Sequence, residues 1–191
     1  MDTRDTLLNA ALKVLEEEGE EQFSTRRICA IAKVTAPTLY HHFGNADGLL
    51  SAAMAEAFAQ FLASKKAATQ SANPVTALRE GWDDYVRFAA ARPRLYAAMM
   101  SRVLDGADIP AAEEAFALLI ARVAAIAGEG RLSRTVEAAA DIMWASANAA
   151  SLLYVTARLR KASMPTAAAL EQIREGALRS ILKSETKGQS Q

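Results

Sequence analysis

Two histidines, His41 and His42, stand side by side directly after Tyr40 and are the only histidines in the chain. Imidazole groups can bind a metal ion, exchange protons in catalysis or hold a phosphate group. Neighbouring residues on a helix point about 100° apart, whereas helical metal ligands usually stand three or four positions apart. We therefore expect this pair to hold no metal ion, and we expect the protein to need no cofactor.

The sequence window that contains the pair, residues 22–46, has no acidic residue. Catalysis by a histidine needs an acid or a nucleophile held against the imidazole, so the window argues against an enzyme. Residues 1–47 carry five basic and eight acidic residues, yet Arg26, Arg27 and Lys33 all lie within the window. Such a window favours contact with a polyanion. Chance in an alanine-rich chain, or a purely structural role for the histidines, stays open as an alternative.

The composition of the 191 residues indicates a packed helical protein, because 51% are apolar and glycine and proline number only nine and five. The first residues lack the features of a secretory signal, and no apolar run approaches the length of a membrane span. Cys29 is the only cysteine, which excludes an intramolecular disulfide. We expect an all-α, cytoplasmic protein without membrane contact.

Apolar residues recur every three or four positions, which predicts a series of amphipathic helices. The expected helices span residues 3–18, 24–32, 35–44, 47–66, 75–91, 94–103, 110–127, 133–161 and 165–183, with Ser133 as the cap of the eighth. Three short helices are thus followed by about six longer ones. This pattern predicts a first domain over residues 1–47, a larger helical domain over 48–183 and a disordered tail over 184–191.

The second and third helices, separated by a three-residue break, form a helix-turn-helix unit. The second helix of such a unit lies in the major groove, with its first residues against the base edges. Those residues here are Thr35, Ala36, Pro37 and Thr38. Arg26 begins the preceding helix, where it is placed to reach a guanine or a phosphate. Tyr40 and His42 follow on the part of the helix that runs along the DNA backbone.

Residues 5–50, and above all the segments S-T-R-R-I and T-L-Y-H-H-F-G, resemble the DNA-binding domain of the TetR family of bacterial transcriptional regulators. The resemblance implies that Thr25 contacts a phosphate and Arg26 a base. It also implies that Tyr40 and His42, with His41 nearby, hold phosphates. Its implied partners are double-stranded operator DNA, a second copy of the chain and a small-molecule effector.

Three positions depart from the family pattern. Lys33 replaces a usual glycine and must adopt the turn conformation at some strain, unless the turn differs. Pro37 replaces another common glycine, and Ala46 replaces a lysine that often contacts phosphate. Lys33 or Asn45 is a candidate to replace that last contact.

Residues 82–100 resemble the start of the regulatory domain in one large subgroup of the same family. The aromatic and methionine residues of the larger domain are candidates to line an effector cavity, although plain core packing explains such a stripe equally well. The candidates are Trp82, Tyr85, Phe88, Tyr96, Met99, Met100, Phe116, Met143, Trp144 and Asn148. Few charges fall among them, which predicts a small and mostly apolar effector.

The last two helices present small and aliphatic residues, including Ala145, Ala149 and Leu152, and the resemblance implies that they form a dimer interface. A dimer has a physical advantage, because two recognition helices together bind an inverted repeat. We expect a dimeric transcriptional regulator, most simply a repressor released by its effector. The alternative from another class is a helical ligand-binding protein that binds no operator.

Overall fold

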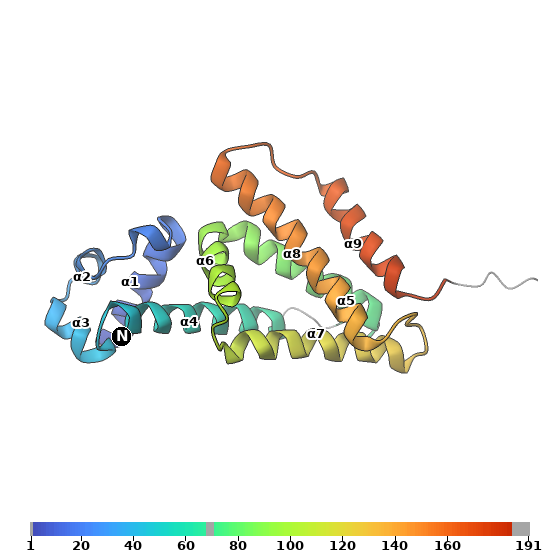
Figure 1. The fold of residues 1–191 in the computed structure, drawn as a ribbon, viewed down its shortest axis with the longest axis horizontal. Coiled ribbons are helices and arrows are strands. Elements are labelled where there is room, and N and C mark those ends of the chain that lie inside the picture. The colour runs from blue at the N-terminus through green and yellow to red at the C-terminus, as the bar shows by residue number, and fades with distance from the viewer. Residues whose placement is uncertain (1, 68–70, 185–191) are drawn as a thin grey trace, which may run out of the picture.

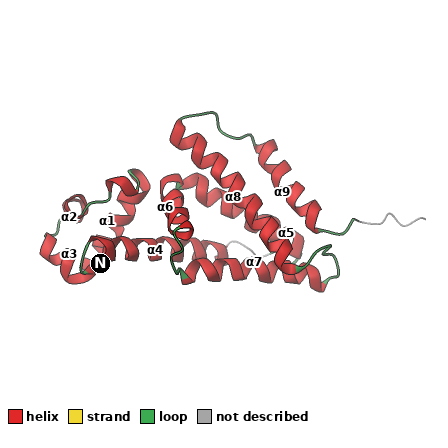
Figure 2. Cartoon of the chain, viewed as in Figure 1, coloured by secondary structure: helices red, strands yellow, loops and turns green. Residues whose placement is uncertain are grey.

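The structure is a computed structural model that describes residues 2–67 and 71–184. The helices in these ranges are α1 (Thr3–Glu17), η1 (Glu20–Gln22), α2 (Thr25–Ala32), α3 (Ala36–Phe43), α4 (Ala46–Ala67), α5 (Pro74–Ala91), α6 (Pro93–Leu104), α7 (Pro110–Gly128), α8 (Val136–Arg160) and α9 (Ala167–Ile181). Helices and the loops between them make up this part of the chain (Figure 2), and its one β-type contact is an isolated bridge between Leu132 and Leu182. The expected all-α fold is therefore confirmed.

Helices α1–α3, which we call the head, lie at one end of the molecule, and α5–α9, which we call the body, form the rest (Figure 1). Helix α4 starts in the head and continues into the body, where it packs on α7. The expected domain boundary after residue 47 falls in the first turn of this helix. The head and the body are thus joined by a continuous helix.

The core of the head comes from apolar residues at helical spacing. Leu7 and Leu15 of α1, Ile28 of α2, Leu39 of α3 and Leu49 of α4 are all fully buried. These side chains meet from four helices, so they set the angle between α2 and α3. Each such side chain contributes about 1.5–3 kcal/mol of burial free energy.

Local signals start and stop the helices of the body. Asn73 caps α5 by accepting hydrogen bonds from the N–H groups of Val75 and Thr76. The Arg92-Pro93 pair ends α5 and starts α6, as expected from the clash between a proline ring and a helical residue before it.

The expected start of α8 at Ser133 is wrong. Thr135 caps this helix by accepting a hydrogen bond from the N–H of Ala138, whereas both the N–H and the hydroxyl of Ser133 donate to Ile181 O. The last helix also begins later and ends earlier than expected, because Thr166 caps α9 and Leu182 is extended. Residues 131–133, before α8, pair with residues 181–183, at the end of α9. This pairing shortens α8 at its start and α9 at its end, and the sequence pattern did not predict it.

The short helix η1 was not expected from the sequence. The predicted tail, residues 184–191, lies outside the described residues apart from Ser184. In the described ranges, none of the helices is long and apolar enough to cross a membrane.

Candidate functional site

The turn between α2 and α3 is held by a left-handed residue. Lys33 has φ 56° and ψ 41°, and its successor Val34 donates from its N–H to Cys29 O at 3.1 Å. This conformation is one that glycine adopts without strain and that other residues adopt at some cost. The turn therefore keeps the geometry of a helix-turn-helix, and Lys33 carries the strain expected for it.

The first turn of α3 presents small side chains to solvent. Thr35, Ala36 and Pro37 are exposed and Thr38 is half-buried, and the hydroxyl oxygens of Thr35 and Thr38 are 2.9 Å apart. Thr35 occupies the N-cap, but its hydroxyl meets Thr38 instead of a backbone N–H. Pro37 lies in the first turn, where its missing N–H has no helical partner to lose.

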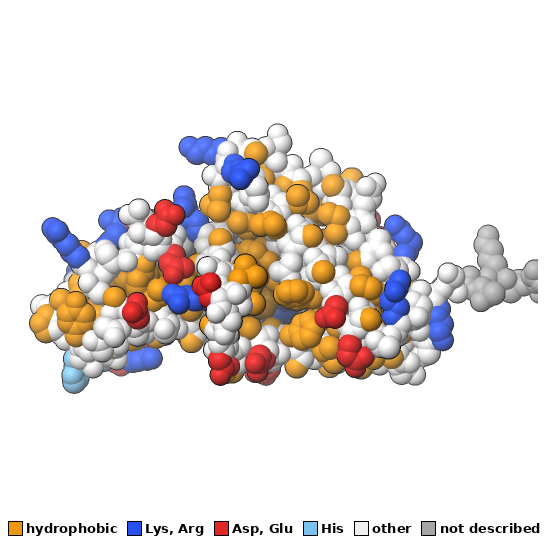
Figure 3. Space-filling view, viewed as in Figure 1, with side chains coloured by type: hydrophobic (Ala, Val, Ile, Leu, Met, Phe, Trp, Pro, Cys, Tyr) orange, Lys and Arg blue, Asp and Glu red, His pale blue; other side chains and the backbone are white. Residues whose placement is uncertain are grey.

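The residues predicted to hold phosphates surround this turn. Tyr40 is 46% exposed, His41 is exposed, and His42 is half-buried, with the two imidazole centroids 5.3 Å apart. Arg26 is exposed at the start of α2, whereas Arg27 pairs with Glu18 at 2.5 Å. The structure thus brings the predicted residues of α2 and α3 onto one end of the head, where Figure 3 shows a histidine at the surface.

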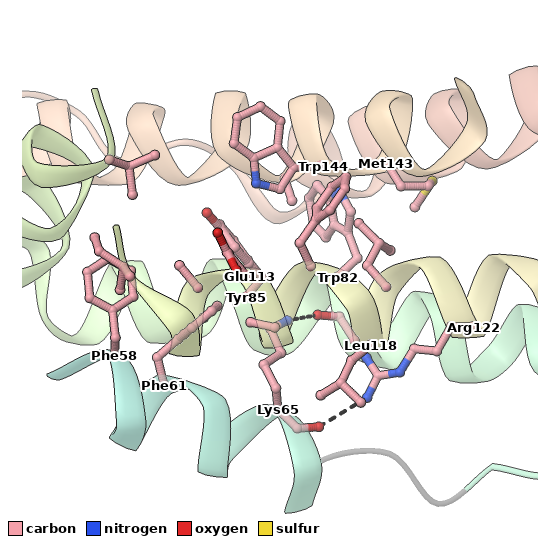
Figure 4. A pocket seen from close by; sticks show the side chains of 18 of the residues that line it. Phe58, Phe61, Lys65, Trp82, Tyr85, Glu113, Leu118, Arg122, Met143 and Trp144 are labelled. Carbon is pink, nitrogen blue, oxygen red and sulfur yellow. Dashed lines mark hydrogen bonds between the residues drawn. The ribbon is translucent and has the colours of Figure 1, made fainter. Parts of the chain in front are cut away.

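The body encloses a cavity of about 490 Å³ between α4, α5, α6, α7 and α8 (Figure 4). Its walls are mainly aromatic and aliphatic. They include Phe58 and Phe61 of α4, Trp82 of α5, Phe116 of α7 and Trp144 of α8. This volume lies within the range of about 300–1,000 Å³ that is usual for small-molecule sites.

Six of the ten side chains predicted to line a cavity do line this one. They are Trp82, Tyr85, Met100, Phe116, Met143 and Trp144. Phe88, Tyr96, Met99 and Asn148 are outside its lining. Met99 is 2% exposed and belongs to the core, and Phe88 packs edge-on against Phe61.

Tyr96 and Asn148 instead form a partly buried polar network with Tyr85, which itself lines the cavity. Both phenol groups donate to Asn148 Oδ1, Tyr85 at 2.8 Å and Tyr96 at 2.7 Å. Asn148 Nδ2 in turn donates to Trp144 O at 3.0 Å. Burial raises the pKa of both tyrosines, so they stay protonated and keep donating. The network joins α5, α6 and α8 at one side of the cavity.

The sequence analysis missed two cations in the cavity wall. Lys65 of α4 is 8% exposed, and its ammonium donates to Gly81 O. Arg122 of α7 donates to Lys65 O at 3.0 Å. The sequence could have predicted the burial of Lys65, because this residue follows Phe58 and Phe61 at helical spacing and so lies on the apolar face of α4.

Three comparisons with known proteins bear on this arrangement. Residues 7–53 match the sequence profile described as bacterial regulatory proteins, tetR family. Over 90 residues the chain is 36% identical to the HTH-type transcriptional repressor NicS of Pseudomonas putida, an alignment that covers 44% of this chain and 42% of NicS. A TetR-family transcriptional regulator from Pectobacterium atrosepticum shares the fold with a TM-score of 0.68 and 26% identity, with 95% of each chain covered. Residues 7–53 therefore carry the DNA-binding domain typical of tetR-family regulators, and the whole chain has the fold of such a regulator.

A second solved structure has the same fold over nearly the whole of this chain. It is a protein of unknown function from Rhodococcus sp. RHA1, with a TM-score of 0.80, 20% identity, and coverage of 96% of this chain and 97% of that one. The likeness therefore extends through the body and beyond the matched head.

The structure distinguishes the two candidates, Asn45 and Lys33, for the phosphate contact that is lost with Ala46. Asn45 Oδ1 accepts from the N–H of Gly48 at 2.8 Å, which caps the first turn of α4. Its side chain is therefore engaged in the fold, while the Lys33 side chain is exposed at the turn. Of the two residues considered as replacements for a lysine at Ala46, Lys33 has the freer side chain.

Proposed function

We propose that this protein is a dimeric transcriptional repressor that binds an inverted-repeat operator and is released by a small molecule in its cavity. The observation that carries the proposal is the exposed surface of α2 and α3, a window without acids on a helix-turn-helix. A DNA backbone repels carboxylates and attracts cations, so such a surface suits DNA. Regulation of transcription then follows from occupation of a promoter.

Within this surface we assign two kinds of contact. Thr35, Ala36, Pro37 and Thr38 lie on the first turn of α3 and face the base edges, where methyl groups can contact a thymine methyl. Thr25, Arg26, Tyr40, His41 and His42 hold phosphates, except that Arg26 is also placed to reach a guanine. Sequence preference therefore resides mainly in the first turn of α3.

The dimer that we propose is formed through α8 and α9. Helix α8 has an exposed stripe at intervals of three, four and seven, made of Ala138, Ala145, Ala149, Leu152 and Leu159. Leu152 is 60% exposed, which is unusual for a leucine beside a well-packed body. Three other small or aliphatic residues of these helices are buried in the interior of the body and are therefore not part of the proposed interface: Ser151, Ala177 and Ile181.

Helix α6 contacts both the cavity and the head, so it can couple ligand binding to the position of the head. It contributes Met100 and Val103 to the cavity wall. The same helix reaches the head, because Arg102 Nη2 donates to Glu20 Oε1 at 3.1 Å and Arg94 Nη1 donates to Glu18 O at 3.3 Å. A ligand that displaces α6 therefore changes the placement of the head, and a dimer then spaces its two heads differently.

The proposal is tested by anisotropy titrations of the purified full-length protein with DNA from upstream of its own gene. Arg26→Ala and Tyr40→Phe should each lower the affinity about tenfold, and Arg26→Ala should make the dependence on salt shallower. Arg131→Ala, which alters a surface arginine paired with Glu129 in the body, serves as the control. An unchanged affinity in the Arg26/Tyr40 double variant would sink the site assignment. No sequence-dependent binding of any DNA, together with ligand binding in the cavity, would favour the non-operator alternative.

A further inference from the structure

We infer that the cavity takes an effector with an anionic group, most simply a carboxylate, which pairs with the ammonium of Lys65 while an aromatic or aliphatic body fills the apolar remainder. This inference rests on the proposed role of the cavity as the effector site and specifies its ligand. Lys65 comes from α4 and points into the cavity in Figure 4.

The ammonium of Lys65 is short of partners. It has three N–H donors, and the one hydrogen bond that it makes within the described residues goes to Gly81 O. None of the ion pairs within residues 2–67 and 71–184 includes Lys65. A buried cation without a directly paired carboxylate is costly to a fold unless a partner arrives. An entering carboxylate supplies both the missing charge and the missing acceptors.

Aromatic rings around Lys65 stabilise the cation only in part. Its Nζ lies 5.0 Å from the centroid of Tyr85 and 5.6 Å from that of Phe61. A ring face attracts a cation but accepts no strong hydrogen bond, so it leaves the donors of the ammonium available. The rings also provide an apolar surface next to the charge, which suits a ligand with an acidic group on an apolar body.

A second cation strengthens the positive potential at the same place. Arg122 lines the cavity, donates to Lys65 O and approaches Gly81 so closely that a side-chain methyl there would collide with its guanidinium. Asp84 attracts both cations, but its carboxylate is paired with Arg87. Burial and, after it, the charge of Arg122 lower the pKa of Lys65 to about 7, while Asp84 acts in the opposite direction. Glu80 as well as Asp84 attracts Arg122.

The acidic residues of the cavity wall are exposed. Glu113 and Asp141 both line the cavity and are open to solvent, whereas Lys65 is buried. Figure 3 shows a hollow bordered by hydrophobic side chains with a basic side chain at its floor. The buried end of the cavity is thus positive, while the carboxylates lie at its solvent-exposed side. This arrangement favours a ligand whose anionic group lies at the buried end and whose apolar or neutral end lies toward solvent.

The chain carries its own reporter for a binding test. Its two tryptophans, Trp82 and Trp144, both line the cavity, so intrinsic fluorescence measures occupancy directly. The probes are matched pairs of acid and amide: phenylacetate with phenylacetamide, 2-naphthoate with 2-naphthamide, and octanoate with octanamide. The amides keep the shape of the acids but lack the charge. The variants are Lys65→Met and, as the matched control, Lys66→Met, which removes the neighbouring lysine that pairs with Glu114 on the surface.

In the wild-type protein we expect at least one acid to bind about tenfold more tightly than its amide, the difference expected for one charge-assisted hydrogen bond. We expect Lys65→Met to abolish this preference and Lys66→Met to keep it. Calorimetry in buffers of different ionisation enthalpy adds a readout at mildly alkaline pH, where acids but not amides should take up a proton on binding. Melting curves of the variants without ligand establish that both are folded.

Equal binding of acids and amides by the wild-type protein would overturn the inference, as would a preference for acids that survives in Lys65→Met. Failure of all three acids to bind at millimolar concentration would also overturn it. None of these results touches the proposed DNA binding, which the titrations without ligand decide separately. If only the amides bind in the cavity and cause the protein to dissociate from its operator, the proposed function stands and the preference for an anionic effector is rejected.

Discussion

Arg92, at the junction of α5 and α6, donates from Nε to Glu16 Oε1 of α1 at 2.8 Å and so joins the body to the head. The same guanidinium donates from Nη2 to Gln60 of α4 at 3.0 Å. The Arg92 side chain therefore links α1 and α4 to the junction of α5 and α6, where the following Pro93 restricts the Arg92 backbone. Any movement of α6 must either carry α1 along or break this contact.

We expect Arg92→Met to loosen the head from the body. It should lower the free energy of unfolding by about 1 kcal/mol, since the pair is partly exposed and the methylene stem is kept. Amide hydrogen exchange should rise at the end of α1 and the start of α6. Urea unfolding and exchange measured by mass spectrometry check both effects. Arg131→Met, in an exposed pair, should change neither, and equal effects of the two substitutions would count against a specific joint.

Lys33→Gly should raise the free energy of unfolding by about 1 kcal/mol, because the left-handed conformation favours glycine. Lys161, which ends α8 with φ 53° and ψ 37°, offers the matched control. Lys161→Gly should stabilise the protein by a similar amount in urea unfolding. The two variants should differ in DNA binding, where only Lys33→Gly should make the salt dependence shallower. Equal salt slopes for both variants would show that Lys33 touches no phosphate.

The head was largely predictable because its determinants are local. The three-residue break at Lys33, the N-cap positions and the spacing of Ile28 and Leu39 are short-range features, and each is present in the structure. A family resemblance over the same residues added the expected contacts with DNA. Only the extra turn η1, which lies between α1 and α2, went unpredicted there.

The body was less predictable because its site depends on packing between distant segments. Hydropathy does not distinguish Met99, which lies in the core, from Met100, which lines the cavity. Tyr96 and Asn148 looked like lining residues, but they bond to each other across 52 residues of chain. Lys65 was overlooked because a lysine near the end of a helix is usually solvated.

Leu152→Glu should convert the protein from a dimer to a monomer. A carboxylate in the middle of the exposed α8 stripe would be desolvated without a partner in a helical dimer interface. Light scattering after size exclusion should give the 20.5 kDa of one chain instead of twice that mass. Leu104→Glu is the control, because Leu104 is 85% exposed at the end of α6, away from the stripe. A variant at Leu152 that stays dimeric would place the interface elsewhere.

Thr38→Ala and Tyr40→Phe should affect DNA binding in different ways. Thr38 lies in the first turn of α3, so its loss should relax the base preference at one position of each half-site. Tyr40 is assigned to a phosphate, so its loss should weaken binding about equally for all sequences. Selection of binding sites from a random DNA pool, followed by sequencing, measures both. A changed base preference with Tyr40→Phe would move Tyr40 from the backbone to the bases.

Lys65 also makes stability depend on pH in a defined direction. Its pKa is about 7 in the folded protein and near 10.5 when unperturbed. Below pH 7 both states carry the charge, and the folded state bears the full cost of burying it. As the pH rises through the folded pKa, the folded protein loses this proton while the unfolded chain keeps it. Unfolding then takes up a proton, so the wild-type protein gains stability until the pH reaches the unfolded pKa.

Lys65→Met should therefore stabilise the ligand-free protein most at acidic pH. The gain is on the order of 5 kcal/mol at most, less the contribution of the hydrogen bond to Gly81 O. It should disappear as the pH approaches the pKa of a free lysine. Urea unfolding of both proteins across this pH range measures the difference, in which the other titrating groups cancel. Lys66→Met should show no such trend, because its ammonium is half exposed. A difference that is independent of pH would mean that Lys65 has the same pKa in the folded and the unfolded protein. A stabilised variant that no longer distinguishes acids from amides would show that the buried lysine costs stability and serves binding.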